Sequence, residues 1–313
     1  MGCFDALTQS LLPQLPARLP ATICIVLHSS PTSPRILDRI LGRATKLPVK
    51  YAEHLEKIRQ GTVYVAPPDN HLLVEDSVLV LDHGPRENWH RPAADPLLRT
   101  AAEAYKDRVI GVVLTGNLDD GARGLGTVKK HGGVTIVQDP HEALAAGMPW
   151  SALQRVDVDY CLPIAEIASV LVQLNRQNGH KPVGASVMSA EAKSAEPEDL
   201  GSYTCPECGG PLTGAKENGL IFFRCRVGHA YSPDSMLQAQ SASVESALWA
   251  AVQSLQQQAD VRVRLAQQAD RLGHGDSARH YRSEAERAEA QSQIIRKLIT
   301  RKEDQATAPK PGN

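Results

Sequence analysis

Residues 109–121 have the sequence VIGVVLTGNLDDG. The first six are largely apolar and rich in valine, which predicts a short strand that is buried on both faces. Glycine, asparagine and aspartate follow and predict a loop, after which residues 121–130 are expected to be helical. A buried strand that leads into a helix is typical of a parallel sheet, because parallel strands need a crossover connection.

The same alternation of strand and helix extends to both sides of this stretch. The strongest further strand is TICIVL, residues 22–27, which ends at His28. Helices are expected at residues 4–15, 35–43, 95–105 and 164–174, and strands around residue 49 and at residues 62–66, 77–81, 134–137 and 156–161. We therefore predict that residues 1–174 form a doubly wound, mostly parallel α/β sheet with helices on both faces.

The chain after residue 174 is expected to contain four further parts. Residues 175–200 are rich in Ala, Ser, Pro, Lys and Glu and lack apolar periodicity, which predicts a linker. The pattern then indicates a small zinc-ribbon-like unit at residues 201–232, an α-helical hairpin at 233–302 and a disordered tail at 303–313.

The predicted hairpin carries two apolar stripes at helical spacing, separated by a loop at residues 273–276. The first stripe consists of Val244, Leu248, Ala251, Leu255, Leu265, Ala269 and Leu272, and the second of Tyr281, Ala285, Ala288, Ile295 and Ile299. We expect the two stripes to pack against each other. Dimerisation, or docking on a receptor helical bundle, is the alternative.

The net charge and the hydropathy pattern argue against several classes of partner. The 313-residue chain has a formal net charge of -1 and a pI of about 6.8, whereas a protein that binds many phosphates usually has a basic excess. It contains no apolar run of about 18 residues, and residues 1–20 lack the pattern of a secretory signal. We therefore expect a cytoplasmic protein with no nucleic-acid partner and no membrane insertion.

Three cysteines and a histidine have the spacing of a metal site. Cys205-Pro-Glu-Cys208 is a CxxC motif, and Cys225-Arg-Val-Gly-His229 supplies one further thiolate and one imidazole. These are the donors that tetrahedral zinc prefers. Because protein would fill all four positions, we predict a structural zinc ion and no cofactor for catalysis. A redox CxxC is the alternative, but it would leave Cys225 and His229 unexplained.

Two polar residues stand at the ends of predicted strands. His28 follows the strand at residues 22–27, and Asp120 follows the strand at 109–114. The carboxyl ends of parallel strands form the edge where open α/β sheets bind ligands. A histidine and a carboxylate there are the orienting half of a Ser-His-Asp triad, in which the carboxylate fixes the imidazole tautomer and the imidazole takes the hydroxyl proton. A loop histidine and a helix-capping aspartate are the alternative interpretation.

Four motifs occur in a fixed order along the first half of the chain. They are GTVYVAPPDNH at residues 61–71, RPAAD at 91–95, LTGNLDDG at 114–121 and GMP at 147–149. Together they resemble the catalytic domain of the chemotaxis protein-glutamate methylesterases, over roughly residues 2–174. The resemblance implies a serine esterase that hydrolyses glutamate methyl esters, with His28 as the family histidine and Asp120 as the family aspartate. It implies methylated chemoreceptor helices as partners, with a receptor methyltransferase as a further candidate.

The resemblance departs from the family at the nucleophile. The family carries a Gly-Ala-Ser-x-Gly-Gly turn between its first strand and first helix, and Gly2-Cys3-Phe4-Asp5-Ala6-Leu7 matches only the end of that pattern. The serine and the first strand would therefore lie just before Met1. Loss of a central strand would leave two neighbouring strands unpaired, so we expect the native chain to start further upstream. A catalytically inactive binding or scaffold protein of a chemosensory pathway is the alternative.

Other motif residues are interpreted as structural. Asn117-Leu118 stands where the family usually has Met-Gly, so a residue other than glycine is expected to strain a loop that needs positive φ. His71, Arg91 and Asp95 are interpreted as loop anchors and ion-pair partners in preference to substrate contacts. The cysteine unit and the residues after it resemble a carboxy-terminal extension of some methylesterase-like bacterial proteins.

Overall fold

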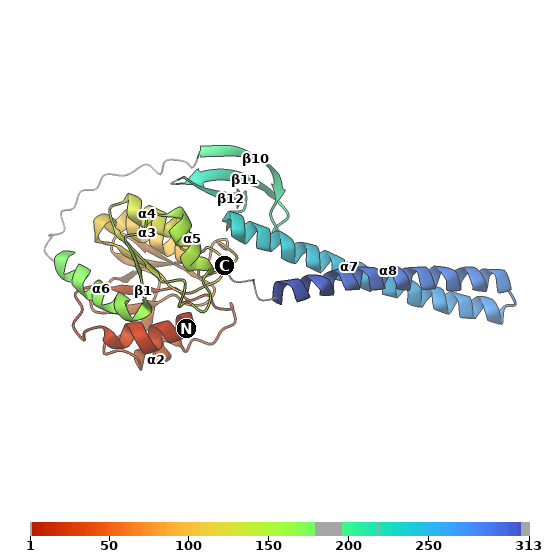
Figure 1. Ribbon diagram of the computed structural model, residues 1–313, viewed down its shortest axis with the longest axis horizontal. Helices are drawn as coiled ribbons and strands as arrows, with labels where there is room; N and C mark the ends of the chain where they lie inside the picture. Colours follow the sequence, from red (N-terminus) through yellow and green to blue (C-terminus); the bar gives the residue numbers. More distant parts are fainter. Residues whose placement is uncertain (1, 179–195, 218, 308–313) are drawn as a thin grey trace. The chain divides into compact units, whose positions relative to one another are not determined.

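The computed structural model describes residues 2–178, 196–217 and 219–307 (Figure 1). The chain divides into two compact units, Met1–Met236 and Leu237–Asn313, and each is described by itself. The first unit contains an α/β part and a small antiparallel sheet. The second unit is built from helices.

The α/β part contains two parallel sheets of three strands each, in the orders β1-β4-β2 and β7-β8-β9. The strands are β1 (Ile23–Ile25), β2 (Val49–Tyr51), β4 (Val63–Val65), β7 (Ile110–Val113), β8 (Val134–Gln138) and β9 (Tyr160–Leu162). Val63 lies opposite both Ile23 and Val49, and Val112 lies opposite Ile136. The predicted parallel sheet is confirmed, although β9 begins at Tyr160 and not at residue 156.

Helices connect the parallel strands. They are α1 (Cys3–Asp5), α2 (Leu37–Gly42), α3 (Ala94–Tyr105), α4 (Ala122–Lys130), α5 (Gly147–Arg155) and α6 (Ile164–Asn178), with a 3-10 turn at Lys106–Arg108. The first helix continues beyond α1 as a wide π-helical segment (Ala6–Leu11) and a tight 3-10 turn (Leu12–Gln14). No helix within the described residues is both long and apolar enough to cross a membrane.

The side chains of β7 explain why helices cover both faces of its sheet. Val112 packs in the same core as Ile167 of α6 and Leu7 of the first helix. Its neighbour Val113 packs in a separate core with Leu125 of α4. Successive strand residues point to opposite faces, so an entirely apolar strand needs a helical layer on each side. The doubly wound arrangement follows from this pattern.

A small antiparallel sheet interrupts the parallel order. Its strands are β3 (Glu56–Lys57), β6 (Val78–Asp82) and β5 (His71–Glu75), in the order β3-β6-β5. β5 and β6 are joined by Asp76 and Ser77, both with positive φ (41° and 70°). A two-residue turn of this kind matches the right-handed twist of a hairpin. Only β6 was expected from the sequence, although the turn signal Pro67-Pro68-Asp69-Asn70 stands directly before β5.

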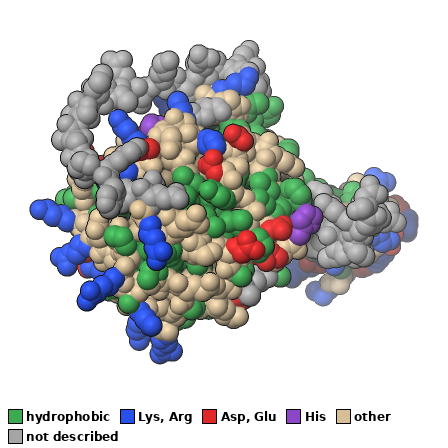
Figure 2. All heavy atoms as spheres, turned by 60° about the vertical axis from the view of Figure 1, so that its left-hand side comes forward, with side chains coloured by type: hydrophobic (Ala, Val, Ile, Leu, Met, Phe, Trp, Pro, Cys, Tyr) green, Lys and Arg blue, Asp and Glu red, His purple; other side chains and the backbone are tan. Residues whose placement is uncertain are grey.

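An apolar slot lies between the edges of the two parallel sheets. Within the described residues, β1 pairs only with β4 and β7 only with β8, so each sheet has one unpaired edge there. A cavity of about 280 Å³ is lined by both edge strands, by α3 and by the first helix, with Cys3, Leu7, Ile23, Ile25, Leu97 and Val112 among the lining residues. Hydrophobic side chains are visible on the surface of the first unit in Figure 2, with Lys and Arg side chains around them.

The small sheet at the end of the first unit has four antiparallel strands, β10 (Glu196–Thr204), β11 (Pro211–Glu217), β12 (Leu220–Cys225) and β13 (Ala230–Tyr231). It is the ribbon predicted at residues 201–232. The predicted linker, 175–200, overlaps α6 at one end and β10 at the other, and its middle, 179–195, lies outside the described residues. Strand β10 is held by backbone pairing with β11, which composition does not reveal.

The second unit contains most of α7 (Pro233–Arg271) and all of α8 (Gly275–Thr307). The helical hairpin is confirmed, but the first predicted stripe is partly wrong: Ala269 is buried as predicted, whereas Val244, Leu265 and Leu272 are exposed. Val252, Ala259 and Ala266, which the stripe does not include, are buried. The second stripe fits better, since Ala285, Ala288 and Ile299 are buried. Small side chains form the contact between the helices, so the larger apolar residues lie beside it. The predicted tail begins inside α8, and residues 308–313 lie outside the described residues.

Candidate active site and metal centre

The structure brings the two predicted catalytic residues together. His28 follows β1 and Asp120 precedes α4, and the His28 Nε2 atom donates a hydrogen bond to Asp120 Oδ2 over 2.7 Å. The side chain of His28 is 26% exposed, whereas that of Asp120 is almost fully buried. With Nε2 committed to the carboxylate, Nδ1 is the ring nitrogen that can take a proton from a nucleophile.

The buried carboxylate of Asp120 accepts hydrogen bonds on both oxygens. Oδ2 also accepts from the backbone N–H of Ala94 (2.6 Å), and Oδ1 accepts from the N–H of Asp95 (3.2 Å) and from Asn88 Nδ2 (3.1 Å). The two backbone donors belong to the first turn of α3. Burial works against the charge of Asp120, but the hydrogen bond and charge of His28 and these donors outweigh it, so the pKa of Asp120 is held well below its usual range.

Asp95 makes the reciprocal arrangement at α4. Its Oδ1 atom accepts from the N–H groups of Gly121 (3.0 Å) and Gly124 (2.7 Å), and its Oδ2 accepts from Asn88 Nδ2 (3.0 Å). Asp120 therefore caps α3, the helix that contains Asp95, and Asp95 caps α4, the helix that follows Asp120. Asp95 is fully buried, which raises its pKa to about 6, with Arg123 opposing that shift. The contacts of Asp95 are those of a structural residue beside Asp120 and are consistent with its structural interpretation.

His90 lies directly against His28. The two rings stack with their centroids 3.8 Å apart and an interplanar angle of 4°. Burial and the neighbouring His28 lower the pKa of His90 to about 4, so His90 is neutral near pH 7 and does not repel a protonated His28. Neither Asn88 nor His90 was predicted as a site residue. The available signal was their position just before the RPAAD motif at residues 91–95.

His71 and Arg91 hold the loops around the site. His71 is buried, which lowers its pKa, and its Nε2 atom bonds the carbonyl oxygen of Pro85 (3.0 Å). Arg91 donates to Asp69 Oδ1 (2.7 Å) and to the carbonyl oxygen of Gly84 (2.6 Å). These are the contacts of loop anchors, in agreement with their structural interpretation.

Leu118 has the positive φ expected of the loop before Asp120. Its φ is 63°, in the left-handed region where a side chain other than glycine costs about 1–2 kcal/mol. We predict that Leu118→Gly stabilises the protein by about 0.5–1 kcal/mol, because the relief of strain exceeds the larger entropy that glycine loses on folding. Urea unfolding checks this, with Leu118→Ala as the matched control. The prediction fails if both substitutions have the same effect, since alanine retains the strained Cβ.

The four predicted metal ligands also come together. One ligand atom from each of Cys205, Cys208, Cys225 and His229 lies within 4.8 Å of the others. The Sγ atoms of Cys208 and Cys225 are 3.7 Å apart, close to the edge of about 3.8 Å that a tetrahedral zinc site with Zn–S of about 2.3 Å requires. His229 Nδ1 faces the sulfurs, while its Nε2 lies 3.3 Å from Glu207 Oε2. A carboxylate on the outer nitrogen is the usual support of a zinc-binding histidine.

Tight backbone turns bring these ligands together. The N–H of Gly209 bonds the carbonyl oxygen of Cys205 (2.8 Å), and the N–H of Gly228 bonds that of Cys225 (3.0 Å). Both glycines have positive φ, 70° and 113°, a conformation that favours glycine. The donor set and its spacing fit a structural zinc ion.

The family of the α/β part follows from comparison with known proteins. The profile of the family described as CheB methylesterase matches residues 1–171. The chain belongs to the CheB methylesterase family. A Leptospira interrogans relative is 43% identical over 171 residues, which are 54% of this chain and 89% of that protein. A Pyrococcus abyssi protein named protein-glutamate methylesterase/protein-glutamine glutaminase is 39% identical over 172 residues, 53% of this chain and 47% of that protein.

A solved structure supports the same assignment. The Thermotoga maritima CheB methylesterase catalytic domain is 36% identical with a TM-score of 0.51, and the likeness covers 55% of this chain and 91% of that one. The prediction of a family of carboxylic ester hydrolases is therefore confirmed. The family match ends at residue 171, so the ribbon and the hairpin of this CheB methylesterase family member lie outside it.

Proposed function

We propose that the protein is a protein-glutamate methylesterase that hydrolyses glutamate methyl esters on chemoreceptor helices by a Ser-His-Asp mechanism. The observation that carries the proposal is the hydrogen-bonded pair of His28 and Asp120 at the strand ends beside the apolar slot. Membership of the CheB methylesterase family supports the reaction class. The names of the relatives also include glutamine deamidation, which would follow the same steps with ammonia as the leaving group.

The slot indicates where the serine would come from. It is bordered by two unpaired strand edges and lined with apolar side chains, so a parallel strand placed there would satisfy backbone groups on both sides. Cys3, at the start of the first helix, is one of the lining residues. We infer that a strand preceding Met1 fills the slot and leads through a turn into α1. The turn would then reach the sheet edge where His28 and Asp120 lie, and it would carry the serine.

The proposed reaction has two steps. The serine hydroxyl attacks the ester carbonyl as His28 Nδ1 takes its proton, and backbone N–H groups of the turn stabilise the tetrahedral oxyanion. His28 gives the proton to the departing methoxide, which leaves as methanol. The glutamyl acyl group stays on the serine as an acyl-enzyme. Water then attacks the acyl group with His28 again as base, and the glutamate carboxylate and free serine are regenerated. Asp120 holds the proton on His28 Nε2 throughout, which selects the Nε2–H tautomer of the neutral ring and stabilises the imidazolium that forms when Nδ1 takes a proton.

Mapping of the native amino terminus tests the proposal. We expect mass spectrometry of the protein from its own cells to find peptides upstream of Met1 that contain a Gly-x-Ser-x-Gly-type turn. That native protein should release methanol from a glutamate-methylated receptor fragment. A native chain that begins at Met1, or a longer one that releases no methanol, would contradict the esterase.

We also propose that Cys205, Cys208, Cys225 and His229 bind one structural zinc ion, which would stabilise the ribbon. Cys208→Ser should lower the zinc affinity by more than about 100-fold, since even support residues of zinc sites contribute roughly 10–100-fold. Competition with a chromophoric chelator measures this. Cys161→Ser is the matched control, because Cys161 is also an exposed free cysteine. Equal zinc affinity of both variants would contradict the assignment.

A further inference from the structure

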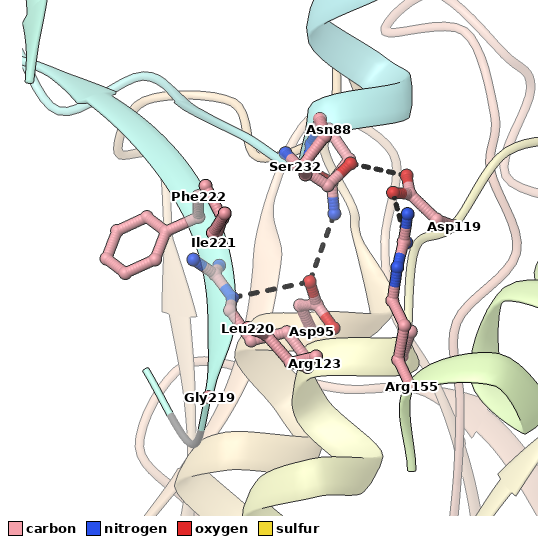
Figure 3. Close-up of a pocket in the computed structure, with 12 residues that line it drawn as sticks. Asn88, Asp95, Asp119, Arg123, Arg155, Gly219, Leu220, Ile221, Phe222 and Ser232 are labelled. Atoms are coloured by element: carbon pink, nitrogen blue, oxygen red, sulfur yellow. Dashed lines mark hydrogen bonds and ion pairs between the residues drawn. The ribbon is translucent and has the colours of Figure 1, made fainter. Parts of the chain in front are cut away.

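Asn88 connects the catalytic aspartate with the metal-binding unit. It is buried, and its Nδ2 atom donates to Asp120 Oδ1 (3.1 Å) and to Asp95 Oδ2 (3.0 Å). Its Oδ1 atom accepts the backbone N–H of Ser232 (3.1 Å), a residue 144 positions later in the chain. Figure 3 shows Asn88 between Asp95 and Ser232. The amide thus bridges two parts of the first unit that the sequence places far apart.

Backbone contacts fix the ribbon against the loop that carries Asn88. The N–H of Asn88 bonds the carbonyl oxygen of Ala230 (2.9 Å), and the N–H of Ala230 bonds the carbonyl oxygen of Arg86 (3.3 Å). Ala230 follows directly after His229, one of the proposed zinc ligands. Displacement of the metal-binding turn would therefore be transmitted to Asn88 through adjacent backbone.

Asp119 supplies a second anchor beside the catalytic residue. Its Oδ1 atom accepts from Ser232 Oγ, in a short hydrogen bond, and from Ser235 Oγ (2.9 Å). Arg155 donates to Asp119 Oδ2 (2.7 Å) and to Asp234 Oδ2 (2.7 Å). Asp119 is 1% exposed, so these contacts are buried at its carboxylate, beside a cavity of about 230 Å³ that Asn88, Asp119 and Ser232 help to line. The contacts hold residues 232–235 next to the loop that presents Asp120 (Figure 3).

The groups on both sides of the Asn88 amide fix which way it faces: two carboxylates lie on its Nδ2 side, and the Ser232 N–H lies on its Oδ1 side. A reversed amide would place its oxygen against two carboxylates and its NH₂ group against a donor, leaving buried groups unpaired. Only one orientation of the amide gives a hydrogen-bond partner to Asp95, to Asp120 and to the Ser232 N–H. Without that N–H, Asn88 Oδ1 would lack this donor in a buried site, and the hydrogen bond to Asp120 would be less firmly held.

We propose that Asn88 is a positioning residue for Asp120, and that the metal-binding unit, through Ser232, holds Asn88 in place. The ribbon is then part of the machinery that keeps His28 in its reactive tautomer. This inference rests on the proposed function of the His28–Asp120 pair. It assigns the carboxy-terminal extension a role in the same reaction.

The tautomer of His28, read from ¹⁵N NMR shifts of its ring, tests the proposal without any turnover. The wild-type chain should show the Nε2–H form almost alone. Asn88→Gly tolerates the φ of 49° at this position and should give a mixture of both tautomers. Asn70→Gly is the matched control, because Asn70 Nδ2 donates to the carbonyl oxygen of Pro68 (3.1 Å) and not to the catalytic carboxylate. In the native esterase, Asn88→Gly should lower kcat about 10- to 100-fold with little change in KM.

Two further changes, both in the ribbon, test whether the ribbon holds Asn88 in place. Ser232→Pro, which removes the N–H that bonds Asn88 Oδ1, and removal of the metal by a chelator should each shift the His28 ring resonances in the direction that Asn88→Gly does. Ala165→Pro, at an exposed position in the first turn of α6 where proline is tolerated, should not. Chelation of the Asn88→Gly variant should add little, because both changes act through one contact. Thermal unfolding checks whether each variant is folded. If Asn88→Gly is not, the Ser232 variant and the removal of the metal still test the proposal.

The outcomes separate this inference from the esterase proposal. Unchanged His28 resonances after Ser232→Pro and after metal removal would overturn the role of the ribbon. Unchanged resonances in folded Asn88→Gly would overturn the role of Asn88. Neither result depends on methanol release, and an inactive native protein with a coupled tautomer shift would overturn only the esterase.

Discussion

Asp120→Asn is expected to lower kcat for methyl-ester hydrolysis about 10⁴-fold, the loss seen when the aspartate of a Ser-His-Asp triad becomes an amide. The physical reason lies in the donors around it. Four groups donate to Asp120, namely His28 Nε2, Asn88 Nδ2 and the N–H groups of Ala94 and Asp95. An asparagine presents one oxygen and one NH₂ group, so the NH₂ group must face two donors. His28 then loses the acceptor that selects its Nε2–H tautomer.

The same substitution is expected to reduce stability by about 1–3 kcal/mol, because it leaves buried donors unpaired at the first turn of α3. Methanol release by the native-length protein measures the rate, and urea unfolding measures stability. Asp139→Asn is a matched control: Asp139 follows β8 and accepts the N–H of His141 (2.9 Å). A loss of less than about 10-fold in kcat would show that the pair is not the catalytic dyad.

The proposed catalytic pair was accessible from the sequence because each residue lies in the loop that follows an apolar strand, β1 or β7. His28 and Asp120 are 92 positions apart, yet a parallel sheet necessarily brings the carboxyl ends of its strands to one edge. Asn88 and His90 follow no such rule. They lie in a loop whose path depends on left-handed residues, Asn88 and Trp89 with φ of 49° and 72°, and on contacts with a distant strand.

The faces through which the two helices of the hairpin contact each other were also only partly predictable. Large apolar residues such as Val244 and Leu265 suggest a face by hydrophobicity alone, but the contact is made by Ala259, Ala285 and Ala288. Alanine allows two helices to approach closely and gives a weak hydropathy signal. The contact between the ribbon and the loop that carries Asn88 was not predictable at all, because it depends on single hydrogen bonds such as that between Asn88 and Ser232.

Glu87 is expected to make a large pH-dependent contribution to stability. It pairs through both oxygens with Arg99 (2.8 Å each) and forms a short ion pair with Arg123. Burial alone would raise the pKa of Glu87, but Arg123 and Arg99 lower it from 4.5 to about 2. Because the folded-state pKa is depressed, the stabilisation is fully present above pH 4.5 and is lost as the pH falls from there towards 2. The difference corresponds to about 3 kcal/mol.

Glu87→Gln should therefore destabilise the protein by about 3 kcal/mol at pH 7, where it leaves two buried arginines short of a charge, and by much less near pH 2. Urea unfolding of both proteins across this range measures the difference. Glu53→Gln is the matched control, since Glu53 pairs with Lys50 at an exposed position and its replacement should change little. A loss of stability in Glu87→Gln that stays constant between pH 5 and pH 2 would contradict the linkage. It would mean that packing, not charge, holds α3 and α4 around this glutamate.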